Sequence, residues 1–435
     1  MMKPLFTAFL LLLVAALPAE PPRVAQKAVS ALQKGKYKTF SRYCQPKFRE
    51  QLSAEQVKGF MDKVQQTYGR ILKISYEAKQ QAEGVEVYRY RLLMEKDSFT
   101  LLIGVEKDLI SGLFLRPFEQ PNVWKKPPYG TGFPVSVKDL EHGVSGWPLK
   151  TQLLWPARFD TARLPVCILV HGSGPNDMDE SMGPNRVFQD LALGLAGQGI
   201  GSLRYNKRTF QYPERYKDKL LTPEEEVYTD LWAMVDLAKQ HDWVDTNRIF
   251  IIGHSQGALM APRFAALRKD LLHDIAGVVM LCGTADSLSR IVEYQIRHLN
   301  MQNGSAGSEE SGAMLHALGS IYDPNQAENA VVLGTSVGWW RRIDTMFRPG
   351  FLDAVPHMVV NAAMDYQVPP RFYTSLRAHC EARKATGACT FREYPTLNHL
   401  LQQSDGSLSP NEYHRPNLHA DEQLIKDIGA WVKSR

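Results

Sequence analysis

The sequence predicts two domains, a small α+β domain followed by an α/β domain with a mostly parallel sheet and helices on both faces. Residues 24–117 place helical patterns before four strand-like runs, an order that favours helices packed on one antiparallel sheet. From residue 134 onward, apolar strand-like runs alternate with helical patterns, as in a parallel sheet covered by helices. The chain has 435 residues, of which 44% are hydrophobic, and this is enough for more than one core.

The N-terminus has the composition of an export signal. Lys3 precedes an apolar run from Leu5 to Leu17, and small residues end at Ala19. The run is short for a bilayer span but suits the apolar part of a cleaved signal peptide, so we expect residues 1–19 to be removed on export to the periplasm or the medium. After cleavage we expect no stable membrane association. An uncleaved anchor is the alternative, because Leu17 is not the small residue preferred before a cleavage site.

The net charge is small. It amounts to +5 and is not clustered, so the sequence gives no reason to expect binding to nucleic acid or to an anionic membrane. The sequence does not indicate the oligomeric state.

The predicted α+β domain spans residues 24–117. Helical patterns cover residues 29–34 and 52–66, and Ser53 before Glu55 and Gln56 is a typical helix start. Four runs joined by short polar turns predict the strands 71–76, 85–92, 99–105 and 109–115. This domain contains no obvious catalytic constellation, so we expect it to bind or pack, with no substrate indicated.

A linker rich in proline and glycine is predicted at residues 118–133, and the α/β domain follows at 134–435. Its first strands, 133–140 and 147–155, form a predicted antiparallel pair. The further predicted strands are 165–171, 199–205, 249–252, 275–281, 357–362 and 389–394. The alternation lapses at about 284–350, where helical patches predict a cap over a pocket, the alternative being a surface subdomain without such a role.

A G-x-S-x-G pattern occupies residues 253–257. Alone it is weak evidence, but an apolar strand-like run, 249–252, precedes it and a helical pattern, 258–267, follows it. Strand, sharp turn and helix are the setting of a nucleophile elbow, in which the glycines let strand and helix approach while the serine lies at the tip. We therefore predict that Ser255 is a nucleophile, the alternative being an ordinary turn serine.

A serine nucleophile needs a histidine base, and the base needs an acid to orient it. In this architecture the acid follows a late strand and the histidine follows the last one. Asp365 lies just beyond the strand ending near Ala362, and His399 lies just past the final strand. We predict a Ser255–His399–Asp365 triad, although either partner alone would more often be a surface residue. The competitors lie before strands, within a helix or in a later polar segment: Asp353, His357, His379, His414 and His419.

Acyl transfer also needs backbone N–H groups that face the developing oxyanion. We expect one from Gln256, which follows the nucleophile, and a second from Gly172 or Ser173, in the small-residue turn after the strand 165–171.

No metal or organic cofactor is expected. The acidic run at residues 177–180 has no second cluster of ligands, and we expect it to form ion pairs with Arg204, Lys207 or Arg208.

The five cysteines differ in their surroundings. Cys167 and Cys282 lie in apolar runs typical of buried thiols. Cys380 and Cys389 flank a short polar loop and would pair in an oxidising compartment, which leaves Cys44 alone. No cysteine and histidine spacing is typical of zinc.

The motifs HGSGPND, GPN, LRYNKR, GHSQGA, DYQV and LNHL resemble those of the EstD-type esterases of the α/β-hydrolase superfamily, from about residue 165 to the C-terminus. The N-terminal domain resembles a cystatin-like or NTF2-like module. The resemblance implies the α/β-hydrolase fold, carboxylesterase activity on short acyl chains, and Ser255, Asp365 and His399 as the triad. Asn206 is a departure, because these enzymes more commonly have Asp there, and this leaves the role of that turn open.

We therefore expect a serine hydrolase that cleaves a small-molecule carboxylic ester through an acyl-enzyme. The same triad cleaves amides and thioesters, so a serine peptidase and a thioesterase are alternatives. A non-catalytic binding protein on a hydrolase scaffold is the alternative from another class, and the intact set of triad residues argues against it. The sequence does not name the physiological substrate.

Overall fold

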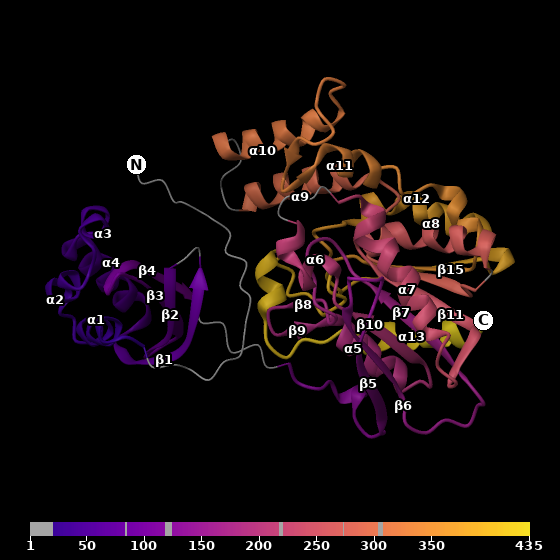
Figure 1. Cartoon of the computed structure of the whole chain (residues 1–435), viewed down its shortest axis with the longest axis horizontal. Helices are drawn as coiled ribbons and strands as arrows, with labels where there is room; N and C mark the ends of the chain where they lie inside the picture. The colour runs from indigo at the N-terminus through magenta and orange to yellow at the C-terminus, as the bar shows by residue number, and fades with distance from the viewer. Residues whose placement is uncertain (1–20, 83–84, 118–123, 217–220, 273, 303–307) are drawn as a thin grey trace. The chain divides into compact units, whose positions relative to one another are not determined.

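The computed structural model describes residues 21–82, 85–117, 124–216, 221–272, 274–302 and 308–435, in two compact units, Met1–Pro121 and Asn122–Arg435 (Figure 1). The predicted signal peptide, residues 1–19, and the first part of the predicted linker, residues 118–123, lie outside the described residues. Among the helices that the structure describes, none combines the length and apolarity needed to cross a membrane.

The first unit is the predicted α+β domain. Its helices are α1 (Arg23–Gln33), α2 (Tyr37–Arg42), α3 (Pro46–Gln51) and α4 (Ala54–Tyr68). An antiparallel sheet follows in the order β1 (Ile71–Ala82), β2 (Val85–Met94), β3 (Ser98–Glu106) and β4 (Leu109–Pro117). A capping box between Ser53 and Gln56 starts α4, as the sequence predicts. Alternate residues of β2 are buried in a core that this unit forms by itself.

The second unit contains an eight-stranded sheet. Its order is β16 (Cys389–Tyr394), β15 (His357–Ala362), β12 (Gly277–Leu281), β11 (Val244–His254), β7 (Leu164–Val170), β10 (Gly201–Tyr205), β6 (Leu149–Pro156) and β5 (Val135–His142). Neighbouring strands are parallel from β16 to β10, whereas β6 pairs antiparallel with both β10 and β5. The predicted α/β fold with a mostly parallel sheet is confirmed.

Helices cover both faces of this sheet. The helices α5 (Val187–Ala196) and α13 (Glu422–Lys433) pack on one face, and α7 (Thr229–Ala238), α8 (Gln256–Leu271) and α12 (Thr374–Arg383) pack on the other. Successive residues Ile251 and Ile252 of β11 enter different cores, because side chains alternate along a strand. Two-sided burial explains the continuous apolar run that predicted this strand.

The insertion between β12 and β15 is mainly helical, as predicted (Figure 1). It contains α9 (Leu288–Gln302), α10 (Glu309–Gly319), the ribbon of β13 (Val331–Val332) and β14 (Thr335–Ser336), and α11 (Val337–Ile343). Trp339 is buried and its Nε1 donates to Glu226 Oε2 at 2.9 Å, which fastens the insertion to the residues that precede α7. Its role as a cap over a pocket stays a prediction.

The second half of the predicted linker packs on the second unit. Trp124 Nε1 donates to Asp190 Oδ1 of α5 at 2.8 Å, and the Tyr129 hydroxyl donates to the Ala420 carbonyl at 2.8 Å. Both bonds fix residues that the composition alone would assign to a flexible linker.

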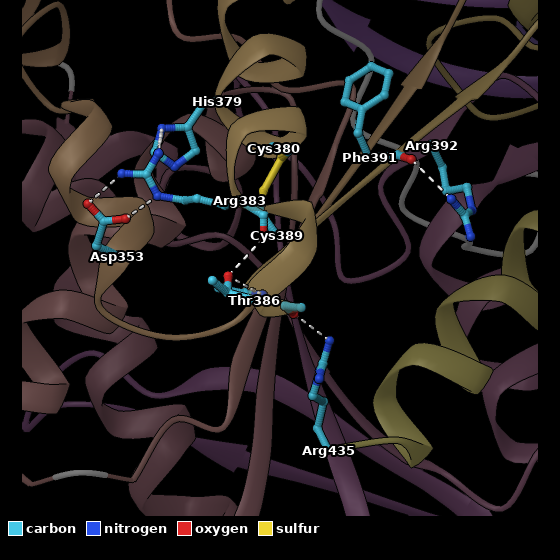
Figure 2. The surroundings of a disulfide bond; sticks show 11 residues. Asp353, His379, Cys380, Arg383, Thr386, Cys389, Phe391, Arg392 and Arg435 are labelled. Carbon is cyan, nitrogen blue, oxygen red and sulfur yellow. Dashed lines mark hydrogen bonds and ion pairs between the residues drawn. A yellow bond between two sulfur atoms is a disulfide. The ribbon is translucent and has the colours of Figure 1, made fainter.

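Cys380 of α12 and Cys389 of β16 form a disulfide, with Cα atoms 4.8 Å apart (Figure 2). The predicted pairing is therefore present, and it ties the helix that follows the Asp365 loop to the strand that precedes His399. Beside it, Arg383 pairs with Asp353 at 2.7 Å (Figure 2). Cys44, Cys167 and Cys282 are free, buried thiols.

Candidate active site

Ser255 lies at a strained turn between β11 and α8. Its φ of 51° and ψ of −113° are rare for a residue with a side chain, and such strain marks the elbow that lifts a nucleophile off the sheet. Two backbone bonds hold the turn. The Ser255 N–H donates to Leu281 O of β12 at 2.9 Å, and its carbonyl accepts from the Leu259 N–H at 3.1 Å.

The elbow also depends on close packing of α8 against β7. A Cβ at Gly257 would lie 2.7 Å from the His171 carbonyl oxygen and closer still to that of Val170. Only glycine allows the first turn of α8 to rest on the end of the neighbouring strand. This contact also brings the residues after β7 next to Ser255.

Asp365 and His399 form a buried pair. His399 Nδ1 lies 2.6 Å from Asp365 Oδ2, and the two residues are 3% and 1% exposed. The other carboxylate oxygen accepts the N–H groups of Gln367 at 2.7 Å and Val368 at 2.9 Å, so the acid is fixed. With its Nδ1–H directed at Asp365, His399 keeps Nε2 for a proton from elsewhere.

Within the described part of the chain, Ser255, the third predicted member of the triad, forms no hydrogen bond with His399. The residue before it is close to the histidine, because the ring centroids of His254 and His399 lie 4.7 Å apart. Long catalytic hydrogen bonds are common in sites without substrate. In the structure, Asp365 therefore contacts His399, and the His399 loop lies against His254, the residue before Ser255.

The two oxyanion candidates after β7 differ in their availability. The Gly172 N–H donates to Glu180 Oε1 at 2.6 Å, so it is not free to face a substrate. This corrects the prediction for Gly172 and leaves Ser173, which is exposed. The Asn176 side chain donates to the Gly172 carbonyl at 3.2 Å, and this carbonyl belongs to the peptide that carries the Ser173 N–H. Gln256 is the first residue of α8, and its N–H belongs to the helix N-terminus, where such groups lack partners inside the helix.

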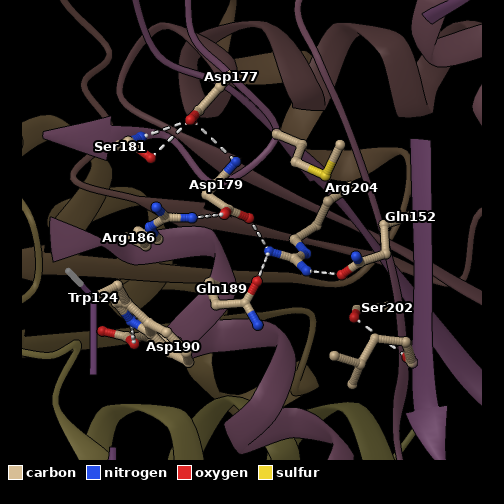
Figure 3. A network of polar contacts seen from close by, with 12 residues as sticks. Trp124, Gln152, Asp177, Asp179, Ser181, Arg186, Gln189, Asp190, Ser202 and Arg204 are labelled. Atoms are coloured by element: carbon tan, nitrogen blue, oxygen red, sulfur yellow. Dashed lines mark hydrogen bonds and ion pairs between the residues drawn. The ribbon is translucent and has the colours of Figure 1, made fainter. Parts of the chain in front are cut away.

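The acidic run is held by ion pairs, as predicted, and of the three predicted partners it is Arg204 that binds the run (Figure 3). Arg204 is fully buried and pairs with Asp179, and its guanidinium also donates to Gln189 Oε1 at 2.7 Å. Arg186 binds the second oxygen of Asp179 at 3.1 Å. Asn206 also holds the run, because its Oδ1 accepts the Met178 N–H at 2.9 Å.

The other two predicted partners bind different acids. Lys207 pairs with Glu226 at 2.6 Å, and Arg208 pairs with Asp230 of α7 at 2.6 Å. Lys207 also donates to the Gly172 carbonyl at 2.9 Å, so it helps to hold the loop after β7 in place.

The sequence prediction missed Glu180 and His254. His254 Nδ1 lies 3.1 Å from Glu180 Oε2, and His254 Nε2 lies 2.9 Å from the His399 carbonyl. Burial alone would lower the pKa of His254, but the charge and hydrogen bond of Glu180, the His399 carbonyl and the Asp365 charge together hold this pKa above its usual 6.5. Burial alone would raise the pKa of Glu180, but the charge and hydrogen bond of His254, with His171 and the Gly172 N–H, together hold it below its usual range. The sequence signal was slight: His254 lies inside the elbow motif, and Glu180 inside the acidic run.

Three residues of the site have ligand-type atoms close together. Atoms of His254, Cys282 and His399 lie within 4.8 Å of one another. Both histidines already contact carboxylates, and burial raises the pKa of Cys282 well above its usual value, with the Asp365 charge and hydrogen bond adding to this. A neutral thiol and engaged imidazoles do not make a ready set of metal ligands.

Comparison with known proteins gives a family match and a relative that aligns over most of both chains. The model of the family "Acetyl xylan esterase (AXE1)" matches residues 217–298, which include the elbow. "Esterase EstD" from Thermotoga maritima is 29% identical over 394 residues, covering 89% of this chain and 90% of that protein.

Solved structures with a similar trace include Est1E from Butyrivibrio proteoclasticus, at 18% identity and a TM-score of 0.44 over 68% of this chain and 99% of that one. Brefeldin A esterase, described as a bacterial homologue of human hormone-sensitive lipase, is 18% identical with a TM-score of 0.45 over 72% and 81%.

Proposed function

We propose that this chain, an EstD-type carboxylic ester hydrolase of the α/β-hydrolase superfamily, cleaves small carboxylic esters with short acyl chains through a Ser255–His399–Asp365 triad and an acyl-enzyme. The buried contact of 2.6 Å between Asp365 and His399, beside an elbow serine, is the observation that carries the proposal. The three triad residues occur along the chain in the order serine, acid, histidine, which is the order typical of this superfamily.

The reaction follows from these positions. His399 Nε2 takes the Ser255 proton as Oγ attacks the ester carbonyl, and Asp365 stabilises the imidazolium that forms. The N–H groups of Gln256 and Ser173 bind the oxyanion. His399 then protonates the departing alcohol, and the acyl group stays on Ser255 Oγ. A water molecule that is deprotonated by His399 releases the acid and restores the serine.

Two further features of the sequence prediction belong to the proposal. We propose that the protein is exported, to the periplasm or the medium, because a signal-like segment precedes the first unit and because disulfides such as Cys380–Cys389 persist in oxidising compartments. The first unit contributes no residue to the proposed triad, and we assign it a binding or packing role.

Hydrolysis of a substrate panel tests the reaction class. The panel contains p-nitrophenyl acetate, butyrate and octanoate, an aminoacyl anilide and an acyl-CoA, together with acetylated xylan, because the family match includes the elbow. We expect turnover of the short esters. Faster cleavage of the anilide or of the thioester would favour the peptidase or the thioesterase instead.

Active-site labelling tests the nucleophile. A fluorophosphonate should label wild-type protein once, at the peptide that contains Ser255, and should not label Ser255→Ala. Ser136→Ala, on the edge strand β5, is the matched control and should label normally. An unlabelled wild type would favour a non-catalytic binding protein.

A further inference from the structure

Glu180 and His254 form a buried ion pair that the proposed reaction does not use. The two residues are 7% and 2% exposed, and Glu180 Oε2 lies 3.1 Å from His254 Nδ1. A buried pair of this kind needs further polar contacts to offset its lost hydration. Each member has one further contact, and both contacts lie in the active site.

On one side, the pair holds the loop after β7. Glu180 Oε1 accepts the Gly172 N–H at 2.6 Å, while Lys207 donates to the Gly172 carbonyl at 2.9 Å. Both polar groups of this residue are therefore fixed. Gly172 also packs on the nucleophile, because a Cβ built there would lie 3.2 Å from the Ser255 Cβ and 2.9 Å from Glu180 Oε1. The position of Glu180 thus sets the position of Gly172, and with it that of the adjoining Ser173 N–H.

On the other side, the pair holds the loop of the base. His254 Nε2–H donates to the His399 carbonyl at 2.9 Å, and the two rings lie with their centroids 4.7 Å apart and their planes tilted by 49°. Since His254 immediately precedes Ser255, this bond joins the backbone of the base to the backbone of the nucleophile.

Glu180 has little freedom to move. Its φ of 49° lies in the left-handed region, and its N–H donates to the Asp177 carbonyl at 3.0 Å. The neighbouring Asp179 is paired with the buried Arg204 (Figure 3). The carboxylate is therefore presented to Gly172 and His254 by an anchored turn.

Burial disfavours the charged form of both members, whereas the charge of each partner and the nearby polar groups favour it. His171 and Lys207 lie near the pair, just after β7 and β10, and Asp365, His399 and Cys282 lie near it in the loops after β15, β16 and β12. Burial lowers the pKa of His171 to about 4, so this neighbour is neutral and does not compete for Glu180 at neutral pH.

We propose that Glu180 and His254 are positioning residues, whose ion pair keeps the loop of the oxyanion donor and the loop of His399 in register with Ser255. This inference rests on the proposed function. A shift of about 1 Å between reacting groups costs about 100-fold in rate, so loss of the pair should lower kcat and leave KM nearly unchanged.

Charge-neutral substitutions test the ion pair while keeping the hydrogen bonds that its members make to Gly172 and His399. The variants are Glu180→Gln, whose amide oxygen can still accept from Gly172, His254→Gln, whose amide can still donate to His399, and the double variant. Short-ester hydrolysis is measured, and kcat is expressed per site titrated with a fluorophosphonate, so only folded, reactive sites count.

Each single variant should lose about 10- to 100-fold in kcat with KM within about threefold of wild type, because it leaves one buried charge without its partner. The double variant buries no lone charge and should lose less than the product of the single losses. Asp274→Asn breaks another buried pair, with Arg268, and is the matched control: it should cost stability and keep kcat per site.

Three results would overturn the inference: a Glu180→Gln enzyme with wild-type kcat per site, single losses that simply multiply in the double variant, or a kcat per site that rises in either single variant. A wild type that neither hydrolyses esters nor reacts with the probe would instead remove the proposed function, and this inference with it. An active wild type with unaffected variants removes the positioning role alone.

Discussion

Gly253 and Gly257 pack backbone against backbone at the elbow. A Cβ at Gly253 would lie 2.7 Å from the Ala258 nitrogen and closer still to the Gly257 carbonyl group. Neither neighbour is the end of a flexible side chain, so the backbone itself would have to move. The two glycines therefore set the distance between β11 and α8, and this distance sets the turn that holds Ser255.

A methyl group at Gly253 should lower both stability and activity. We expect Gly253→Ala to reduce the free energy of unfolding by about 1–3 kcal/mol, as overpacking of a filled site does, and to reduce kcat further in the folded fraction. Gly312→Ala is the matched control: no atom lies within 4 Å of its Cβ, and in helix α10 it should stabilise by about 0.5–1 kcal/mol. Urea unfolding and titrated kcat measure both effects, and a fully active Gly253→Ala would contradict the elbow geometry.

The triad variants should differ in severity. Ser255→Ala and His399→Ala should each lose about 10⁶-fold in kcat, because the members act as a unit, whereas loss of the Asp365 carboxylate in Asp365→Asn should cost about 10⁴-fold. His414→Ala removes an exposed histidine and should leave turnover unchanged. Steady-state hydrolysis of p-nitrophenyl acetate provides the comparison, and near-normal turnover in His399→Ala would mean that another residue is the base.

The Glu180–His254 pair should stabilise the fold within a defined pH range. The pKa of His254 is raised, so its contribution is complete below its unfolded value of 6.5 and is lost as the pH rises through the folded value. The pKa of Glu180 is lowered, so its contribution is present above its unfolded value of 4.5 and is lost as the pH falls through the folded value. The difference in unfolding free energy between wild type and His254→Gln should therefore be largest between pH 4.5 and 6.5 and should shrink above that range. A difference that grows from pH 6.5 to 9 would be inconsistent with this sign.

The disulfide should stabilise the second unit. Closing a loop with a sequence separation of 9 is worth about 2.7 kcal/mol in the chain-entropy model, so the double variant Cys380→Ser/Cys389→Ser should lose about this much. Reductant should lower the Tm of wild type but not that of the double variant, which serves as the control. Alkylation of both cysteines before any reduction, in protein expressed in the periplasm, would show that the bond does not form there.

The first unit should be dispensable for the chemistry. Deletion of Val24 to Pro117 should largely keep kcat on a small soluble ester, because the unit has its own core and all three proposed triad residues lie in the second unit. Circular dichroism of the shortened protein provides the folding control. A collapse of kcat in a shortened protein that remains folded would give the first unit a part in the active site.

The sequence predicts those parts of the fold and of the candidate site that depend on hydrophobic periodicity and on the order of the strands. Ser255, Asp365 and His399 each follow a strand that the apolar runs identify, and the carboxyl ends of parallel strands meet at one edge of the sheet. The capping box at Ser53 is likewise a local pattern, readable from four successive residues.

The sequence does not predict contacts that depend on how a loop folds back. Glu180 and His254 are separated by 73 intervening residues in the printed sequence, and their contact requires the left-handed turn at Glu180, which no residue type demands. The same turn brings Glu180 to the Gly172 N–H, so the choice between Gly172 and Ser173 could not be made from residue types. The acids that bind Lys207 and Arg208 could not be predicted either. They are Glu226, just before α7, and Asp230, within it, and only tertiary packing decides which side of this helix faces the basic residues.

The strand order has a consequence for synthesis. Moving outward from β11, the sheet adds β12, β15 and β16 in the order in which the ribosome makes them. The strand that precedes Ser255 is therefore made before the strands that precede Asp365 and His399. If the proposed triad is correct, a nascent chain that ends before β16 has the serine but lacks the imidazole that would activate it, so we expect it to be inactive on esters. Hydrolysis would then begin only after β16 has joined the sheet and the His399 loop beyond it has folded back toward Ser255.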